Sequence, residues 1–420
     1  MRKKFLIFVL FIVIIFTSYS TAVSEIEKKN KDDIYKQVKL FSDALVMIQT
    51  DYVNDVSSKS LIYGALKGML SSLDPYSQFM DPDAYNELKA DTEGKFGGIG
   101  IEITMKDSLL TVVTPMQDTP AWEAGIKTND RIVKIDNKLI RNITLMDAVR
   151  KLRGKPGSVV DITILRESEK KILEFKIVRD IIKIKDIKEA RILDDGIGYI
   201  RLAEFRENTP NDFDVAFENL SKSNMSGFIL DLRNNPGGLL DIAVRIAERF
   251  VEKGKVIVSI KGRKITQSLE FVSRAVNPSL RLPMVVLINE GSVSGSEIVA
   301  GCLHDYGRAI IVGIKSYGKG SVQTVIPLGD GSALRLTTSK YFTPKGIEIH
   351  GKGVIPDIVV EETKVVAPKA EEDKPEDVFK KIEQKEKIKK EEKAFDYKSD
   401  NQLSRAVDIL KAIRIYKEIK

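Results

Sequence analysis

The sequence contains little of what metal and disulfide sites require. Its 420 residues include one Cys, two His and one Trp. The single cysteine, Cys302, cannot form a disulfide within the chain and excludes zinc sites built from several cysteines. Two histidines are too few for a histidine-rich metal centre. We therefore expect neither a metal nor a cofactor, and any chemistry has to come from other side chains.

An excess of charge of one sign is also lacking. The chain has 67 Lys and Arg against 60 Asp and Glu, a net charge of +7, and 30% of its residues are charged. Because the two signs are mixed, we interpret the small basic excess as an aid to solubility and to weak attraction toward an anionic membrane, and predict no nucleic-acid partner. The 43% of hydrophobic residues indicates a globular protein of two or three domains.

The N-terminus has the order of an export signal. Three basic residues, 2–4, precede an apolar run over residues 5–16, and small or hydroxylic residues follow to Ala22. The run is shorter than the ~20 residues that span a bilayer as a helix. We assign residues 1–22 to a signal peptide or membrane anchor, and both outcomes stay open. In either case the rest of the chain is expected in the periplasm, free or held at the inner membrane.

Hydrophobic periodicity predicts a multidomain α/β protein. Apolar residues three to four apart indicate an N-terminal helical region, short β runs indicate a compact β-rich unit, and continuous apolar strands followed by helices indicate an α/β core with both sheet faces covered. A mixed-charge linker and an amphipathic helix follow. In chain order these parts comprise residues 32–94, 95–182, 187–362, 363–398 and 399–420.

A glycine-rich segment, Gly98-Ile99-Gly100-Ile101, lies at the start of the first predicted β run, residues 99–103. Glycines allow successive backbone N–H groups to converge on an anion such as a C-terminal carboxylate, whose peptide then adds a strand to the sheet. An ordinary glycine-rich turn is the alternative interpretation. Residues 120–126 and 129–136 follow in an order and spacing that resemble a PDZ domain. This resemblance implies that Gly98 to Ile101 is a carboxylate-binding loop.

A second glycine-rich segment, residues 313–320, nearly matches the phosphate-binding pattern G-x-x-x-x-G-K-[ST]. Its last position is Gly320, which has no hydroxyl to bind magnesium. Residues 321–327 have the pattern of a strand, where the phosphate-binding motif requires a helix. We therefore reject nucleotide binding.

A third turn, residues 291–297, is rich in hydroxyl groups and connects a buried strand to a helix. Ser296, which is followed by Glu297 and an apolar run, is predicted to cap that helix. Ser294 lies in the tight turn itself, where its hydroxyl and the N–H of Gly295 can face one cleft. A serine nucleophile beside an oxyanion donor needs this geometry.

The general base for this serine is either a histidine or a lysine. His304 lies ten residues into the helix, about 15 Å away at ~1.5 Å per residue, whereas His350 is not excluded by its position. Lys319 can serve if burial lowers its pKa from ~10.4, although a solvated turn lysine is the alternative interpretation. Alternation along the strand places Lys319, Ser321 and Gln323 on one face, so that Gln323 can orient the amine.

Three ordered motifs, residues 233–240, 291–301 and 317–323, together resemble the carboxyl-terminal processing proteases, the tail-specific Ser/Lys peptidases of bacteria and plastids. The resemblance extends from about residue 32 to residue 360 and includes the inserted PDZ domain. It implies an α/β protease core and an endopeptidase that captures apolar protein C-termini on the PDZ domain and cleaves upstream.

The resemblance also implies roles for individual residues. Ser294 would be the nucleophile, Lys319 the general base and Gln323 the residue that orients the lysine. The N–H groups of Gly238 and Gly295 would form the oxyanion hole, although this family usually has Ala at the second position.

The sequence constrains regulation and partners less than it constrains the chemistry. In this family the PDZ domain can gate the active site, and Arg153, in a turn, is our candidate for relaying peptide binding; a solvated turn residue is the alternative. The terminal helices suggest partner contacts, which leaves open a homodimer and an activating partner protein. The alternative function is a PDZ scaffold or chaperone that binds exported tails without cutting them.

Overall fold

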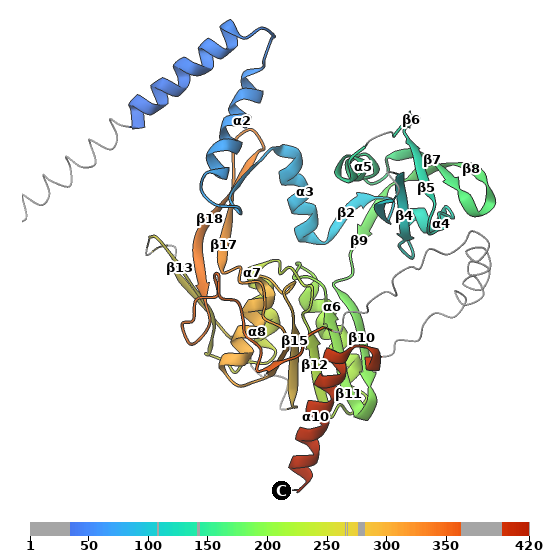
Figure 1. Ribbon diagram of the computed structural model, residues 1–420, viewed down its shortest axis with the longest axis vertical. Coiled ribbons are helices and arrows are strands. Elements are labelled where there is room, and N and C mark those ends of the chain that lie inside the picture. The colour runs from blue at the N-terminus through green and yellow to red at the C-terminus, as the bar shows by residue number, and fades with distance from the viewer. Residues whose placement is uncertain are drawn as a thin grey trace, which may run out of the picture. The chain divides into compact units, whose positions relative to one another are not determined.

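The computed structural model describes residues 34–106, 109–140, 143–264, 266, 268–275, 282–362 and 397–419 (Figure 1). The predicted signal or anchor, residues 1–22, lies outside the described residues. The chain divides into two compact units, residues 1–81 with 325–336 and residues 82–324 with 337–420. Among the described residues, no helix combines the length and the hydrophobicity needed to span a bilayer.

The smaller unit is mainly helical. A helix over residues 34–51 is followed by α2 (Ser58–Ser71), whose first turn is capped by the Ser57 hydroxyl, and by β1 (Gln78–Met80). β1 pairs antiparallel with the first residues of β18 (Ala333–Phe342). Tyr63 on α2 donates a hydrogen bond to Asp330 at 2.7 Å and packs its ring on Phe79. The sequence predicts the helices, but β1 has its pairing partner about 250 residues later and shows no local strand signal.

The larger unit begins with α3 (Pro82–Glu93), which the sequence analysis groups with the N-terminal helices, and with the two-stranded pair β2 (Lys95–Gly98) and β9 (Asp180–Lys183). The predicted PDZ region then forms an antiparallel sheet in the order β3-β4-β5-β7-β8, with β6 (Lys138–Leu139) paired to β5. Its β3 is an edge strand, which a peptide can extend. The bounds are β3 (Ile101–Lys106), β4 (Leu109–Pro115), α4 (Pro120–Glu123), β5 (Arg131–Ile135), α5 (Leu145–Leu152), β7 (Val159–Arg166) and β8 (Lys171–Val178).

The core of the larger unit is a six-stranded sheet in the order β10-β11-β12-β15-β16-β19. β10 is antiparallel to β11, and the other neighbours are parallel. The elements are β10 (Ile187–Leu193), β11 (Ile197–Leu202), α6 (Thr209–Ser221), β12 (Gly227–Asp231), α7 (Leu240–Glu248), β15 (Met284–Ile288), α8 (Gly295–Asp305), β16 (Ile310–Gly313) and β19 (Ile358–Val359).

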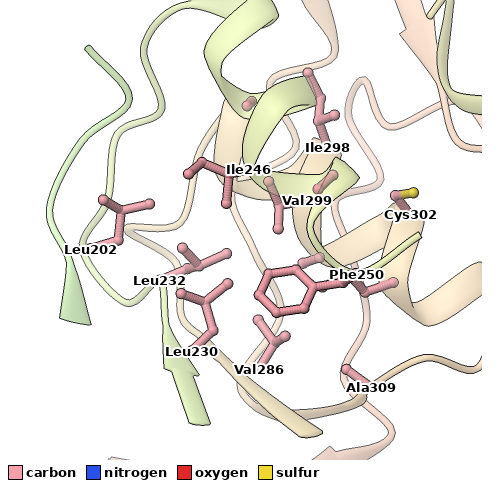
Figure 2. Packing of buried hydrophobic residues seen from close by; sticks show 14 of the residues in the cluster. Leu202, Leu230, Leu232, Ile246, Phe250, Val286, Ile298, Val299, Cys302 and Ala309 are labelled. Atoms are coloured by element: carbon pink, nitrogen blue, oxygen red, sulfur yellow. The ribbon is translucent and has the colours of Figure 1, made fainter. Parts of the chain in front are cut away.

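Both faces of this sheet are covered, as its continuous apolar strands predict. On one face, Leu230 and Val286 pack with Phe250 and with Ile298 of α8 (Figure 2). On the other face lies α10 (Asn401–Ile419), preceded by the 3₁₀ turn η4 (Tyr397–Ser399). The predicted fold class, an α/β core with an inserted PDZ domain and N-terminal helices, is confirmed.

A second sheet in the larger unit contains β13 (Val256–Gly262), β14 (Leu269–Val272) and the last residues of β18. β17 (Ser321–Pro327) pairs with β18. The strand that begins at Ser321 matches the prediction for residues 321–327, and it starts directly after Lys319 and Gly320.

Candidate active site

Three loops meet at one edge of the core sheet. They follow β12, β15 and β16, which are adjacent and parallel. Because the carboxyl ends of parallel strands lie at the same edge of a sheet, this arrangement gathers segments that are far apart in sequence. The three motifs of the sequence analysis, residues 233–240, 291–301 and 317–323, contribute these loops.

Ser294 lies between β15 and α8 in a strained conformation. Its φ is 56° and its ψ is −110°, outside the regions that residues with a side chain normally adopt. The Ser294 N–H donates to Glu297 Oε2 at 2.9 Å, which holds the turn in place. A strained turn between a strand and a helix is the geometry that presents a nucleophilic serine in other hydrolases.

The prediction that Ser296 caps the helix was wrong. α8 begins at Gly295, so that Ser294 is the N-cap residue and Ser296 lies in the first turn. The hydroxyl of Ser296 donates instead to the carbonyl of Asn235 at 2.9 Å. The chain enters the helix directly after the left-handed Ser294, which moves the start of the helix ahead of Ser296.

Glu297 joins the serine turn to the lysine loop. Its side chain is fully buried. One oxygen, Oε2, accepts hydrogen bonds from the N–H groups of Ser294 and Lys319, both at 2.9 Å. The other, Oε1, accepts from the Ser316 hydroxyl and the Gly318 N–H, both at 2.6 Å. The backbones of Ser294 and Lys319 are therefore neighbours.

This role of Glu297 is not predicted by the sequence pattern. The spacing Ser294 to Glu297 matches the capping-box pattern, which predicts the bond within the turn. The other three donors come from a loop about 20 residues later, and local spacing contains no signal for them. These contacts also distinguish the loop from a phosphate-binding loop. The N–H groups of Gly318 and Lys319 donate to the Glu297 carboxylate and so do not face a phosphate.

The loop after β12 lies against the serine turn. A Cβ atom on Gly237 would lie 2.7 Å from Ser294 Cβ and 2.8 Å from the Gly295 nitrogen. Gly238 has a φ of 139°, and a Cβ there would lie 2.2 Å from the carbonyl oxygen of Phe205. Position 238 therefore requires glycine. Hydrogen bonds from Phe205 N–H to Gly237 O and from Leu239 N–H to Phe205 O, both 2.8 Å, flank it.

Phe205 also packs closely against Gly295, the position at which this chain departs from the family pattern. At Gly295, where the resemblance has Ala, a Cβ would lie 3.1 Å from the Phe205 ring and 3.2 Å from Ala243 Cβ. An alanine methyl group at this position would therefore require these two side chains to shift slightly, whereas glycine fits without any shift. The assignment of the Gly238 and Gly295 N–H groups to an oxyanion hole remains a prediction, which is favoured by the close approach of Gly237, the neighbour of Gly238, to Ser294 and Gly295.

Lys319 and Gln323 lie on either side of Ser321. The Gln323 amide nitrogen donates to the Ser321 hydroxyl at 2.8 Å and to the Ser321 carbonyl at 3.2 Å. Ser321 and Gln323 thus share a face of β17, as alternation predicts. The Lys319 carbonyl accepts from the Tyr341 hydroxyl, which fixes the backbone of the loop. That Gln323 orients the Lys319 amine stays a prediction.

The two histidines differ in their relation to this site. His304, near the end of α8, lies 3.2 Å from an Asp357 oxygen. His350 packs its backbone behind Gly320, where a Cβ would lie 2.2 Å from the His350 nitrogen. Its Nδ1 is buried and has no hydrogen-bond partner among the described residues. His350 therefore remains the alternative base to test.

The predicted carboxylate loop lines a pocket in the PDZ region. Gly98, Ile99, Gly100 and Ile101 all border a cavity of about 100 Å³, together with Phe96, Ile103, Val149, Leu152 and Arg153. The strand begins at Ile101, two residues later than predicted, because Gly100 has a φ of +76° and ends β pairing there. The pocket is mostly apolar and lies between edge strand β3 and α5.

Arg153 forms the charged wall of this pocket. Its guanidinium lies over the Phe96 ring, 4.3 Å from the centroid. It also lies 3.5 Å from a Glu87 oxygen and 3.4 Å from an Asp91 oxygen of α3. Arg153 is thus half-buried and paired with carboxylates, unlike the solvated turn residue of the alternative interpretation.

Comparisons with protein families agree with this geometry. The model of peptidase family S41 matches residues 196–360, a PDZ domain model matches residues 97–177, and a model described as the N-terminal domain of the activating protease CtpB matches residues 12–84. Fold and site together define the class: a serine peptidase with an α/β core and a PDZ domain.

Similar individual proteins indicate a narrower family within this class. The carboxy-terminal-processing protease of Bartonella bacilliformis is 45% identical over 360 residues, which is 84% of this chain and 82% of the relative. Carboxy-terminal processing protease CtpB of Bacillus subtilis is 37% identical over 330 residues, 78% of this chain and 68% of the relative. The solved photosystem II D1 C-terminal processing protease is 30% identical, covers 77% of this chain and 92% of its own, and has a TM-score of 0.46. The chain belongs to the carboxy-terminal-processing proteases of peptidase family S41.

Proposed function

We propose that this protein is an exported serine endopeptidase that binds apolar protein C-termini on its PDZ domain and cleaves them through an acyl-enzyme on Ser294. The observation that supports the site most strongly is Glu297, whose Oε2 bonds the backbones of Ser294 and Lys319. A nucleophile and a base must lie within reach of each other, and this shared acceptor fixes the two loops that carry them.

In the proposed reaction, neutral Lys319 takes the proton of the Ser294 hydroxyl as its oxygen attacks the substrate carbonyl carbon. The N–H groups of Gly238 and Gly295 stabilise the resulting oxyanion. The Lys319 ammonium then gives its proton to the leaving amine, and water hydrolyses the ester on Ser294. Gln323 orients the Lys319 amine.

The proposed substrate class follows from the PDZ pocket. A peptide added to β3 would place its last side chain among Ile99, Ile101 and Leu152 and its carboxylate at the glycine loop. Backbone N–H groups and a nearby arginine favour a charged carboxylate over a neutral end group. An apolar residue with a free carboxylate is therefore the preferred terminus.

The first test compares an unfolded reporter that ends in an apolar residue with a free carboxylate and the same reporter with a C-terminal amide. We expect the free acid to be cleaved with a kcat/KM at least about tenfold higher, because hydrogen bonds to a charged group contribute ~1.5–3 kcal/mol. Equal cleavage of the two would contradict recognition of the terminus. Binding without any cleavage would favour the scaffold instead.

We further propose that Arg153 relays peptide binding. A C-terminal carboxylate in the pocket would compete with Glu87 and Asp91 for the Arg153 guanidinium, and α3 carries both of these partners. We expect Arg153→Ala to abolish the stimulation of cleavage by an added tail peptide. Lys155→Ala, an exposed neighbour, serves as the matched control. Stimulation that persists in Arg153→Ala would contradict this role.

Localisation and partners are proposed on the same basis. Residues 1–22 would export the chain or anchor it at the inner membrane, which places the protease in the periplasm. The helix over residues 34–51 exposes Tyr35, Val38 and Met47, a surface that suits a second copy or an activating partner. No nucleic-acid partner is proposed.

A further inference from the structure

A buried arginine connects the C-terminal helix to the loop that contains Gly238. Arg233 lies two residues after the end of β12 and precedes that loop, and its side chain is only 7% exposed. The Arg233 guanidinium contacts Asp400, which lies just before α10, and Gln402, which lies in the first turn of α10. The C-terminal segment therefore contacts the arginine from which the active-site loop starts.

All five N–H groups of the Arg233 guanidinium have acceptors. Nε and Nη2 donate to Asp231, at 3.0 and 2.7 Å. Nη2 and Nη1 donate to the two carboxylate oxygens of Asp400, at 2.7 and 3.0 Å, and Nη1 also donates to Gln402 Oε1 at 3.0 Å. Three of the five donors thus depend on residues that follow the charged linker.

The helix that brings these residues is anchored independently. Leu403, Val407 and Leu410 of α10 are buried together with side chains of β12 and β15. At the start of α10, Gln402 Nε2 donates to the Val360 carbonyl at 2.7 Å. Further along, Lys411 pairs with Asp195 at 2.6 Å. Asp400 and Gln402 are therefore held by a docked helix.

We propose that Asp400 and Gln402 are positioning residues of the active site, which act through Arg233 to hold the loop 234–238 in its working geometry. This inference rests on the proposed function, because it assigns these residues to the placement of the Gly238 donor. A carboxylate that accepts two parallel bonds from a guanidinium fixes its plane as well as its position. The C-terminal helix then completes the catalytic domain.

Asp400 could position the Arg233 side chain or could merely neutralise its charge, and the charge balance distinguishes these two roles. Asp231 alone suffices to neutralise Arg233, with which it already forms a paired contact. An Asp400→Asn change therefore leaves no unpaired buried cation. It replaces one acceptor oxygen by an amide N–H₂ that faces an Arg233 nitrogen, so that the double hydrogen bond is lost while side-chain volume is kept. The expected defect is in geometry, and catalysis is sensitive to displacements of about 1 Å.

The test uses the full-length protein with the tail reporter and compares Asp400→Asn with Asp400→Glu and with Lys411→Ala. Lys411→Ala also removes an ion pair between α10 and the core, but it lies away from Arg233. We measure kcat and KM, the melting temperature, and inhibition by a peptide aldehyde whose tetrahedral adduct occupies the oxyanion hole.

We expect Asp400→Asn to lower kcat about 10- to 100-fold and to weaken aldehyde inhibition by a similar factor, with KM within about twofold of wild type. Asp400→Glu should recover part of kcat, and Lys411→Ala should keep kcat near wild type. Equal kcat in Asp400→Asn and Lys411→Ala, or losses that follow only the melting temperature, would overturn the inference. Absence of Ser294-dependent cleavage in the wild type would refute the proposed function, and this inference with it.

Discussion

Replacement of Ser294 or Lys319 by Ala is expected to lower the rate of peptide cleavage about 10⁴-fold or more, because each removes a group that the proposed chemistry cannot replace. Without the Ser294 hydroxyl no acyl-enzyme forms. Without the Lys319 amine the proposed mechanism has no base to take the proton of that hydroxyl. Both variants should still bind a tail peptide on the PDZ domain. Initial rates on the tail reporter and tail binding by calorimetry test this.

Variants of the loop that contains Lys319 provide controls for the predicted effect of Lys319→Ala. Lys315, which is exposed and lies four residues before Lys319, provides a matched Lys315→Ala variant that should cleave normally. Lys319→Arg should be inactive, because a guanidinium stays protonated and cannot act as a base. Cleavage should rise with pH as the Lys319 amine loses its proton. If Lys319→Ala still cleaves and His350→Gln does not, His350 is the base and the proposed mechanism is wrong.

Replacement of Glu297 by Gln is expected to lower kcat about 10²- to 10³-fold and the free energy of unfolding by about 2–4 kcal/mol. The carboxylate accepts four hydrogen bonds, two on each oxygen. A glutamine amide can accept on one side only, and its N–H₂ would face two donors on the other. The serine turn or the lysine loop must then shift.

The matched control for this variant is Glu290→Gln, at an exposed glutamate of the loop between β15 and α8. It should leave both kcat and stability near wild type. Urea unfolding and initial rates measure the two quantities separately. A Glu297→Gln protein with wild-type kcat would show that the shared carboxylate does not hold the two loops in register.

The fold and much of the site can be predicted because the signals are local. β15 (Met284–Ile288) is predictable because five consecutive apolar residues lie between Pro283 and Asn289, and the serine turn follows within a few residues. β17 is predictable from its alternation, which also places Ser321 and Gln323 on one face. In each case neighbours in sequence determine the structure.

The features that sequence reasoning missed depend on contacts between distant segments. β1 forms only by pairing with Ala333 to Arg335. The role of Glu297 depends on hydrogen-bond donors in the loop after β16. The Asp400 carboxylate meets Arg233 across 167 positions of chain. Ser296 was assigned to the helix cap because pattern rules ignore the left-handed φ of Ser294, which starts the helix earlier.

The central claim, an acyl-enzyme on Ser294 formed with Lys319 as base, is tested most directly by trapping the intermediate. Wild-type protein is mixed with a peptide thioester that ends in an apolar residue, quenched in acid within seconds, digested and analysed by mass spectrometry. The account predicts the acyl group on the peptide that contains Ser294, at much lower yield in Lys319→Ala. Thioester hydrolysis that passes through no adduct, or an adduct on another residue, would contradict it.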